Sequence, residues 1–351
     1  MDSQPATTAT SLPPECYVDP GFEVRERSDI FARSWQLVAH ASQLGAAGDH
    51  VVAEIAGVPL VVVRGSDGIL RALHNVCRHR AGPVALCDGR GARSLTCKYH
   101  GWSYELDGQL RGAPDMRDVP GFEISAIQLP QASVAEWQGL VFAALEASAP
   151  FESIVAGIDT RLEAGATANR LFGYVRASRV SYEIDCNWKV YVDNFLEGYH
   201  LPVVHPALNR LLNYRQYRTE LAPWHSLQWS PLEQAQGPYG AGEALYYWLF
   251  PNTMLNVLPG RLQTNRVLPL GPQRCRVDFD YYYPADAPPA AADSDRVFAD
   301  EVQAEDTAIC EAVQRGLASG SYVAGRLNPT RESGVWHFHE LLRAAFRSTS
   351  A

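Results

Sequence analysis

The sequence has no glycine-rich G-x-G-x-x-G motif after a strand pattern, no C-x4-C-x2-C spacing and no internal repeat. The first absence argues against a flavin or nicotinamide held within the chain. The second argues against a [2Fe–2S] cluster of the plant ferredoxin type. Redox chemistry in this chain would therefore depend on electrons that a separate protein delivers.

Positive charge is also scarce. The 351 residues carry 30 Lys and Arg against 39 Asp and Glu, a formal net charge of −9, and no run of basic residues occurs. This balance argues against a nucleic-acid partner. Seven cysteines, an odd number, fit a reducing cytoplasm better than a disulfide framework.

The first fourteen residues, MDSQPATTATSLPP, lack the basic start and apolar core of a signal peptide and are too polar to span a membrane. We expect residues 1–14 to be a disordered tail and residues 15–35 to be a helical lead-in that belongs with the domain of residues 148–351. Short strands with S-D-G and D-G turns predict an all-β domain over 36–147. Residues 148–351 mix helical and strand patterns, which predicts an α+β domain with helices packed on an antiparallel sheet.

Two cysteines and two histidines stand in two short loops. Cys77 and His79 form a C-x-H pair, and after seventeen intervening residues Cys97 and His100 form a C-x2-H pair. The four residues suit a tetrahedral zinc ion, or a Rieske [2Fe–2S] cluster with the cysteines on one iron and the histidines on the other. Zinc loops usually offer like ligands in each pair. Each loop here offers one Cys and one His, which favours the Rieske cluster.

A second motif reads CNWKVYVDNFLEGYHLPVVHP. Glu197 and His200 are three residues apart and would share one face of a helix. The proline that follows forbids a regular helix, so His205 can fold back towards His200. Two histidines and one carboxylate make a facial triad that binds Fe(II) and leaves positions open. The residues alone leave Asp193 and the distant Asp306 as alternatives for that carboxylate.

These segments resemble the Rieske non-haem iron oxygenases in their large catalytic (alpha) subunit. HNVCRHRAG and CKYHGWSYELDG are similar to the two cluster loops, and N-W-K…N-F…E-x2-H-x4-H with a late aspartate is similar to the catalytic domain. Members often read H-R-G after the first ligand histidine, whereas this chain reads His79-Arg80-Ala81-Gly82. The resemblance covers roughly residues 15 to 345. It is nearest the carnitine, betaine and choline monooxygenase subset, which has Glu where most members have Asp.

The resemblance implies an all-β Rieske domain joined to an α+β catalytic domain with a helix-grip-like sheet. It implies two sets of metal ligands: for the [2Fe–2S] cluster Cys77, His79, Cys97 and His100, and for the mononuclear iron His200, His205 and Asp306. Glu197 takes the place of the acid that bridges this iron to the Rieske cluster of a neighbouring subunit without binding metal. That route implies a homotrimer with head-to-tail contacts.

The resemblance also implies the reaction. Members use O2 and electrons from a separate reductase, in some cases with a ferredoxin, to hydroxylate a C–H bond, so NAD(P)H acts only indirectly. Oxidative demethylation or cleavage of a quaternary ammonium compound is the favoured activity. Hydroxylation of an aromatic ring or an organic acid is the alternative, in which Arg261 or Arg266 could pair with a carboxylate. A zinc-binding protein or a simple electron carrier is a remote alternative, since the iron motif after residue 150 has no role in either.

A quaternary ammonium substrate would need an aromatic cage for cation–π attraction. The residues that we expect to supply it are Phe195, Tyr246, Tyr247, Trp248 and Phe250.

Overall fold

The computed structural model describes residues 3–165, 171, 173–233, 239–287 and 289–348. Contacts divide the chain into two compact units, one of residues 31–148 and the other of residues 1–30 with 149–351. Within the described residues, no helix combines the length and apolar character that crossing a membrane requires.

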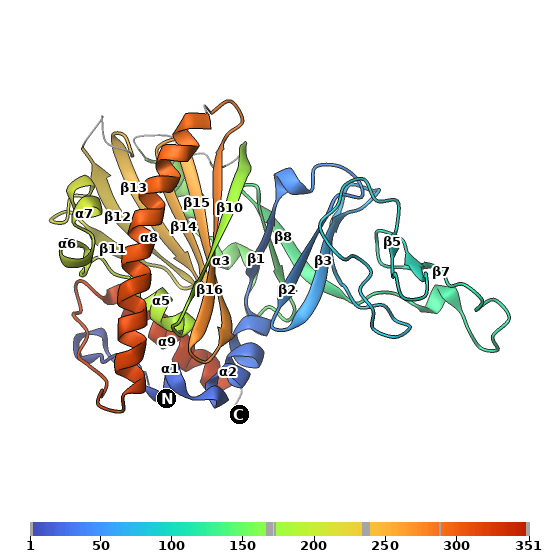
Figure 1. The fold of residues 1–351 in the computed structure, drawn as a ribbon, viewed down its shortest axis with the longest axis horizontal. Helices are drawn as coiled ribbons and strands as arrows, with labels where there is room; N and C mark the ends of the chain where they lie inside the picture. The colour runs from blue at the N-terminus through green and yellow to red at the C-terminus, as the bar shows by residue number, and fades with distance from the viewer. Residues whose placement is uncertain (1–2, 166–170, 172, 234–238, 288, 349–351) are drawn as a thin grey trace. The chain divides into compact units, whose positions relative to one another are not determined.

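The unit of residues 31–148 has strands, joined by long loops, as its main regular structure (Figure 1). Six strands form an antiparallel sheet in the order β1-β9-β8-β4-β3-β2, and three short strands form a second sheet, β5-β6-β7. The strands are β1 (Gln36–His40), β2 (His50–Ile55), β3 (Val58–Arg64), β4 (Leu70–His74), β5 (Leu95–Thr96), β6 (Ser103–Tyr104), β7 (Leu110–Gly112), β8 (Gln131–Trp137) and β9 (Leu140–Ala144). Short 3-10 turns are η3 (Phe31–Arg33), η4 (Ala41–Gln43) and η5 (Ile124–Ala126).

Strand β3 supplies both hydrophobic cores of this unit because successive side chains of a strand point to opposite faces. Val61 and Val63 pack in the core that contains Cys77 and Cys97. Leu60 and Val62, on the other face, join the core beneath β1 and β9. The continuous apolar run of β3 is thus buried on both sides, and one of its faces supports the two Cys/His loops.

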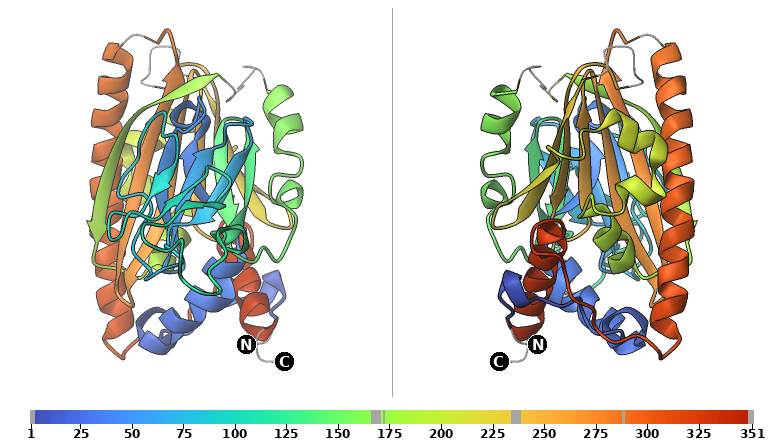
Figure 2. Two further views of the ribbon diagram at one scale, coloured as in Figure 1. Left: turned by 90° about the vertical axis from the view of Figure 1, so that its right-hand side faces the viewer. Right: turned by 90° about the vertical axis from the view of Figure 1, so that its left-hand side faces the viewer.

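The other unit contains a seven-stranded antiparallel sheet in the order β10-β16-β15-β14-β13-β12-β11. Its strands are β10 (Tyr174–Ile184), β11 (Arg218–Leu221), β12 (His225–Leu232), β13 (Gly242–Leu249), β14 (Thr253–Leu258), β15 (Arg261–Gly271) and β16 (Arg274–Pro284). The long helix α8 (Pro289–Ala318) runs along this sheet, with α5 (Trp188–Phe195) and α9 (Ser333–Ser348) near its lower end (Figures 1 and 2). The expected fold class, an all-β domain plus an α+β domain with an antiparallel sheet and helices, is confirmed.

Shorter helices complete this unit. They are η1 (Ala6–Thr8), α1 (Glu15–Val18), α2 (Pro20–Arg25), η2 (Glu26–Ile30), α3 (Phe151–Ile154), α4 (Ile158–Glu163), α6 (Leu201–Val204) and α7 (Pro206–Leu211). Helices α6 and α7 are separated by a single residue, His205, and both have proline in their first turn. Proline is favoured there because its missing N–H would have no partner within the helix.

The prediction of a disordered tail over 1–14 was wrong for the residues that the structure describes. Ala9 and Leu12 are almost fully buried. The backbone pairs with the segment after α8, since Ser11 N donates to Gly325 O at 2.9 Å and Leu327 N donates to Ala9 O at 3.1 Å. These partners are more than three hundred residues away along the chain, so local composition could not reveal them.

The N-W-K segment at the start of α5 is held by a buried acid from the lead-in helices. Asn187 caps α5 by accepting from Lys189 N. Glu26 accepts from the Trp188 indole N–H at 2.7 Å and forms an ion pair with the Lys189 ammonium group. Glu26 and Lys189 are 2% and 0% exposed, so each is the counter-charge that makes burial of the other tolerable. This pair fixes the start of the helix that leads to the metal motif.

We predict that Glu26→Gln lowers the free energy of unfolding by about 3–5 kcal/mol, because it leaves the Lys189 charge buried without a counter-ion. Urea unfolding followed by circular dichroism measures the change. Glu23→Gln, which removes only the partially exposed pair with Arg27 at 3.8 Å, is the control and should change the free energy by less than about 1 kcal/mol. Equal effects of the two substitutions would contradict the role of Glu26.

Candidate functional site

The two Cys/His loops have the same backbone hydrogen bonds although their Cys–His spacings differ. In both Cys77–Gly82 and Cys97–Trp102, the cysteine N–H donates to the carbonyl five residues later, at 2.8 and 2.9 Å. The N–H four residues later donates back to the cysteine carbonyl, at 3.0 Å in each loop. The residues making this return bond are Ala81 and Gly101, with φ of 59° and 74°. The alanine therefore stands in the left-handed position that glycine occupies in the second loop.

The cysteine and histidine side chains of these two loops differ in burial. Cys77 and Cys97 are 4% and 2% exposed, while His79 and His100 are exposed, with ring centroids 4.6 Å apart. A Cβ on Gly82 would come within 3.0 Å of Cys97 Sγ, so the backbone closes tightly around that sulfur. Buried thiols beside paired surface imidazoles match the donor set of a Rieske cluster, whose histidine iron faces solvent.

The shared geometry predicts that two substitutions in these loops have different effects on stability. Gly101→Ala should lower the free energy of unfolding by about 1–2 kcal/mol, the cost of placing a Cβ in left-handed backbone. Ala81→Gly should not destabilise the protein, because the strain that it relieves offsets the greater freedom of glycine in the unfolded chain. Thermal unfolding of the two variants tests this, and destabilisation by Ala81→Gly equal to that by Gly101→Ala would show that the loops are not equivalent.

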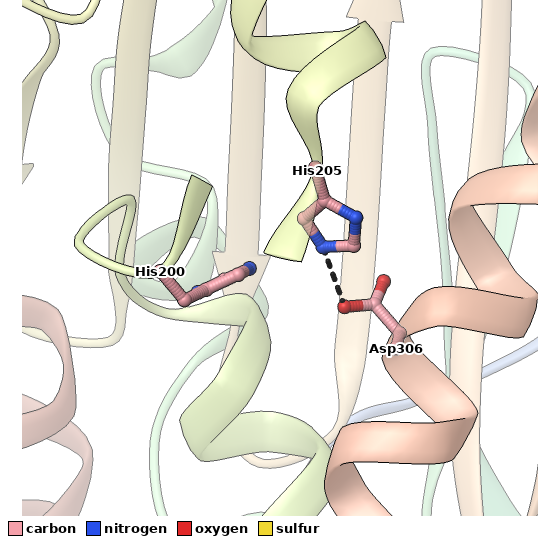
Figure 3. Close-up of side chains that lie close together, drawn as sticks. All are labelled: His200, His205 and Asp306. Carbon is pink, nitrogen blue, oxygen red and sulfur yellow. Dashed lines mark hydrogen bonds and ion pairs between the residues drawn. The ribbon is translucent and has the colours of Figure 1, made fainter. Parts of the chain in front are cut away.

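His200, His205 and Asp306 come together in the other unit (Figure 3). His200 precedes α6, His205 separates α6 from α7, and Asp306 projects from α8. One ligand atom from each lies within 4.8 Å of the others. His205 Nε2 is 2.9 Å from Asp306 Oδ1. A carboxylate and two imidazoles converging in this way form the donor set of a facial triad.

A carboxylate lies against Nδ1 of each histidine. Glu197 Oε1 is 2.5 Å from His200 Nδ1, and Glu305 Oε2 is 2.6 Å from His205 Nδ1. Each contact leaves Nε2 of the ring for a metal ion, an arrangement common in protein metal sites. Burial alone would lower the pKa of His205, but Asp306 and Glu305 together raise this pKa above its usual value. The same excess of negative charge favours a cation between these groups.

The sequence prediction placed Glu197 and His200 on one face of a helix, and this was wrong. Helix α5 ends at Phe195, and Glu197 lies in the turn before α6. The Glu197 carboxylate accepts hydrogen bonds from the backbone N–H groups of Tyr199 and His200, which follow it in the turn. The contact between the two side chains therefore comes from a local turn.

Two supporting residues were missed by sequence reasoning. Glu305 accepts or shares the proton at Nδ1 of His205, and its place next to Asp306 in the sequence was the available signal. Asn194 donates from Nδ2 to Asp306 Oδ1 at 2.6 Å, and its place in the N-F part of the motif was the available signal. Both orient groups of the His200, His205 and Asp306 cluster.

Asp193, the alternative acid, is turned away from this cluster. Its carboxylate accepts from the Tyr17 hydroxyl at 2.6 Å and lies 2.9 Å from Nε2 of the fully buried His339. Asp193 thus joins α5 to α1 and α9, and Asp306 is the acid that the structure brings to the two histidines.

A cavity of about 100 Å³ lies beside the His200, His205 and Asp306 cluster. Helices α5 and α8 and the sheet supply its walls. Its aromatic lining residues are Tyr191, Phe195, Tyr217, Tyr239, Tyr246 and Phe279. We call this cavity the inner pocket.

Three of the expected cage residues do not line the inner pocket, whereas Phe195 and Tyr246 do. Tyr247 points to the opposite face of β13, where its ring lies 6.1 Å from that of His225. Trp248 is two residues beyond Tyr246 and is covered by Phe338 of α9, at 5.3 Å between centroids. Phe250 packs against Trp248 at 6.0 Å. The prediction failed because it treated consecutive aromatic residues as one surface, whereas strand alternation and α9 separate them.

Comparisons with known proteins agree with the two predicted domains of the chain. Residues 172–348 match the family described as ring hydroxylating alpha subunit (catalytic domain), and residues 34–123 match the Rieske [2Fe-2S] domain. The chloroplastic choline monooxygenase of Arabidopsis thaliana is 36% identical, over 96% of this chain and 83% of that protein. The carnitine monooxygenase oxygenase subunit of Escherichia coli K12 is 32% identical, over 97% of this chain and 94% of that protein.

Solved structures show the same likeness. The quaternary ammonium Rieske monooxygenase CntA in complex with L-carnitine has a TM-score of 0.86 at 28% identity, covering 98% of this chain and 99% of that chain. Naphthalene 1,2-dioxygenase from Rhodococcus sp. has a TM-score of 0.79 at 20% identity, covering 97% and 95%. At that identity the second comparison shows a shared fold alone.

Proposed function

The chain belongs to the Rieske non-haem iron oxygenases as a catalytic alpha subunit, and from this membership we propose that it oxidises a carbon beside the nitrogen of a quaternary ammonium compound. Its cofactors are a Rieske [2Fe–2S] cluster and one mononuclear iron. When bound, they supply electron transfer and the insertion of oxygen from O2 into a C–H bond. The electrons come from a separate reductase, with or without a ferredoxin.

The inner pocket is the observation that carries the proposal. Rings of Phe195, Tyr246 and Phe279 line it together with the carboxylates of Glu197 and Asp306. Aromatic faces and carboxylates both attract a cation, and a quaternary ammonium group can use only such contacts because it has no N–H to donate. The pocket adjoins the His200, His205 and Asp306 cluster, so a methyl or methylene carbon next to nitrogen would lie beside the iron.

We assign the cluster and iron to the residues that carry their motifs. Cys77, His79, Cys97 and His100 would hold the [2Fe–2S] cluster, and His200, His205 and Asp306 would hold the iron. The burial of the two thiols and the convergence of the triad atoms within 4.8 Å support this assignment.

Glu197 is, in this proposal, the bridging acid. Its carboxylate contacts His200 Nδ1, and Glu197 also lines a second cavity of about 740 Å³. A head-to-tail homotrimer would bring the exposed His79 and His100 of one subunit towards Glu197 of the next. We further propose a reducing compartment such as the cytoplasm, since none of the seven cysteines forms a disulfide in the described chain.

An organic acid anchored by Arg261 or Arg266 is less well supported. Arg261 forms an ion pair with Asp295, and Arg266 Nη2 lies 3.1 Å from Asp278 Oδ2. Both guanidinium groups already have a carboxylate partner.

The proposal is tested by supplying the reconstituted protein with a surrogate reductase, NADH and O2, and measuring aldehyde release from choline, carnitine and betaines. Substrate-dependent aldehyde formation from at least one of them is expected. Aldehyde from none of them, together with turnover of an aromatic acid, would refute the proposal.

We predict that the two metal sites can be removed independently. His200→Ala should lose mononuclear iron and all turnover but keep the visible spectrum of the cluster, because the cluster ligands belong to the other unit. Cys97→Ala should bleach that spectrum. Iron analysis, absorbance and product assays separate the two variants, and an active His200→Ala enzyme would make the triad assignment wrong.

Glu197→Gln keeps the shape of the side chain but replaces the charged acceptor at His200 Nδ1 by a neutral amide. We expect both metals to remain bound, the cluster to be reduced normally, and product formation to fall by about a hundredfold, as for other groups that orient metal ligands. Glu197→Asp should be milder. Loss of mononuclear iron from Glu197→Gln would instead make Glu197 a ligand.

A further inference from the structure

The wall of the inner pocket contains a row of polar side chains that crosses four strands. Gln228 on β12 pairs with Tyr246 on β13, Tyr246 with Asn256 on β14, and Asn256 with Gln263 on β15. Directly paired residues on neighbouring antiparallel strands point to the same face of a sheet. All four side chains line the inner pocket, so they form one continuous surface, which we call the polar row.

The lining of the inner pocket has negative and neutral groups but no Lys or Arg among the described residues. Arg261 is the cation closest in register, two residues before Gln263 on the same face of β15. Its guanidinium pairs with Asp295 on α8, and the two side chains are only 12% and 6% exposed. Asp295 also accepts from the Tyr283 hydroxyl at 2.8 Å. This arrangement holds Arg261 against α8, with its guanidinium 5.3 Å from the ring centroid of Tyr239 at the edge of the pocket, and Asp295 neutralises its charge.

Two atoms of the polar row are buried without a hydrogen-bond partner in the described structure, Asn256 Oδ1 and the Tyr246 hydroxyl. An unpaired buried polar atom is costly, so a ligand that satisfies it gains affinity. A ligand hydroxyl can donate to the amide oxygen and accept from the phenol. A carboxylate can only accept hydrogen bonds. Without a cationic partner in the pocket, nothing would compensate for the water that it loses on binding.

The place of the iron ligands sets the direction of a bound ligand, because His200, His205 and Asp306 lie at one part of the pocket lining. The reacting carbon must lie beside His200, His205 and Asp306, so the ammonium head occupies that end and the remainder of the ligand lies against the polar row.

Resting on the proposed function, we propose that the inner pocket selects a quaternary ammonium alcohol, with an uncharged hydroxyl tail on the polar row, over zwitterions that carry a carboxylate. Gln228, Asn256 and Gln263 are then specificity-determining residues, and the Arg261–Asp295 pair keeps a positive charge out of the tail site.

Equilibrium binding to the holoenzyme, measured by calorimetry without reductase, tests this directly. The probes are choline, glycine betaine, which matches choline in length but ends in a carboxylate, and the uncharged carbon isostere of choline. We expect choline to bind at least about tenfold more tightly than glycine betaine, since a site built to hydrogen-bond a hydroxyl rejects ligands that lack it.

The two hypotheses fail in different ways. Equal binding of choline, glycine betaine and the carbon isostere would overturn the proposed function, because no cation would be recognised. Preference for choline over the isostere, combined with equal or tighter binding of glycine betaine, would overturn only the selection of a hydroxyl tail.

Variants of the tail site extend the test. Gln263→Lys places a cation in the polar row and should shift the ratio of glycine betaine to choline affinity upwards by at least about tenfold. Gln263→Met, the neutral control of similar length, should weaken choline without strengthening glycine betaine. Asp295→Asn removes the carboxylate that neutralises Arg261, so it should shift the affinity ratio of glycine betaine to choline in the same direction as Gln263→Lys. This variant replaces Gln263→Lys in the test if Gln263→Lys does not fold. An unchanged ratio in every folded charged variant would contradict the proposal.

Discussion

The proposed catalytic centre depends on the hydrogen bonds that two carboxylates make with the two histidines of the His200, His205 and Asp306 cluster. Glu197 holds Nδ1 of His200 and Glu305 holds Nδ1 of His205, at 2.5 and 2.6 Å. These bonds fix the rings so that both Nε2 atoms are left for the position that Asp306 faces. Without them, two histidines at the two ends of the short helix α6 would have many side-chain orientations, and the donor set would not converge.

Helix α8 connects this centre to the rest of the pocket. It carries Asp306 of the triad, Glu305 that orients His205, and Asp295 that pairs with Arg261. The three acids share one long helix, which the sheet supports along its length (Figure 2). In the proposed assignment, one rigid element therefore supplies a metal ligand, orients a second one and holds Arg261 away from the polar row.

The parts of the site that sequence predicted are those encoded by short spacing or by resemblance. The Cys77–His79 and Cys97–His100 pairs and the two triad histidines are local patterns, whereas Asp306 needed the family resemblance to be chosen over Asp193. Packing between segments far apart in the chain could not be predicted from the sequence. Three features depend on contacts between distant segments. They are the burial of Ala9 against the segment after α8, the position of Glu305 beside His205, and the covering of Trp248 by α9. The aromatic cage failed for a simpler reason, since Tyr246 and Tyr247 necessarily face opposite sides of one strand.

The central claim is that one chain holds two different iron centres, and the most direct measurement is metal analysis combined with electron paramagnetic resonance of the purified wild-type protein. The account predicts about three iron atoms per chain, a red-brown colour, and a signal of the reduced Rieske type after dithionite. Colourless protein holding one zinc ion per chain, with no such signal, would contradict it.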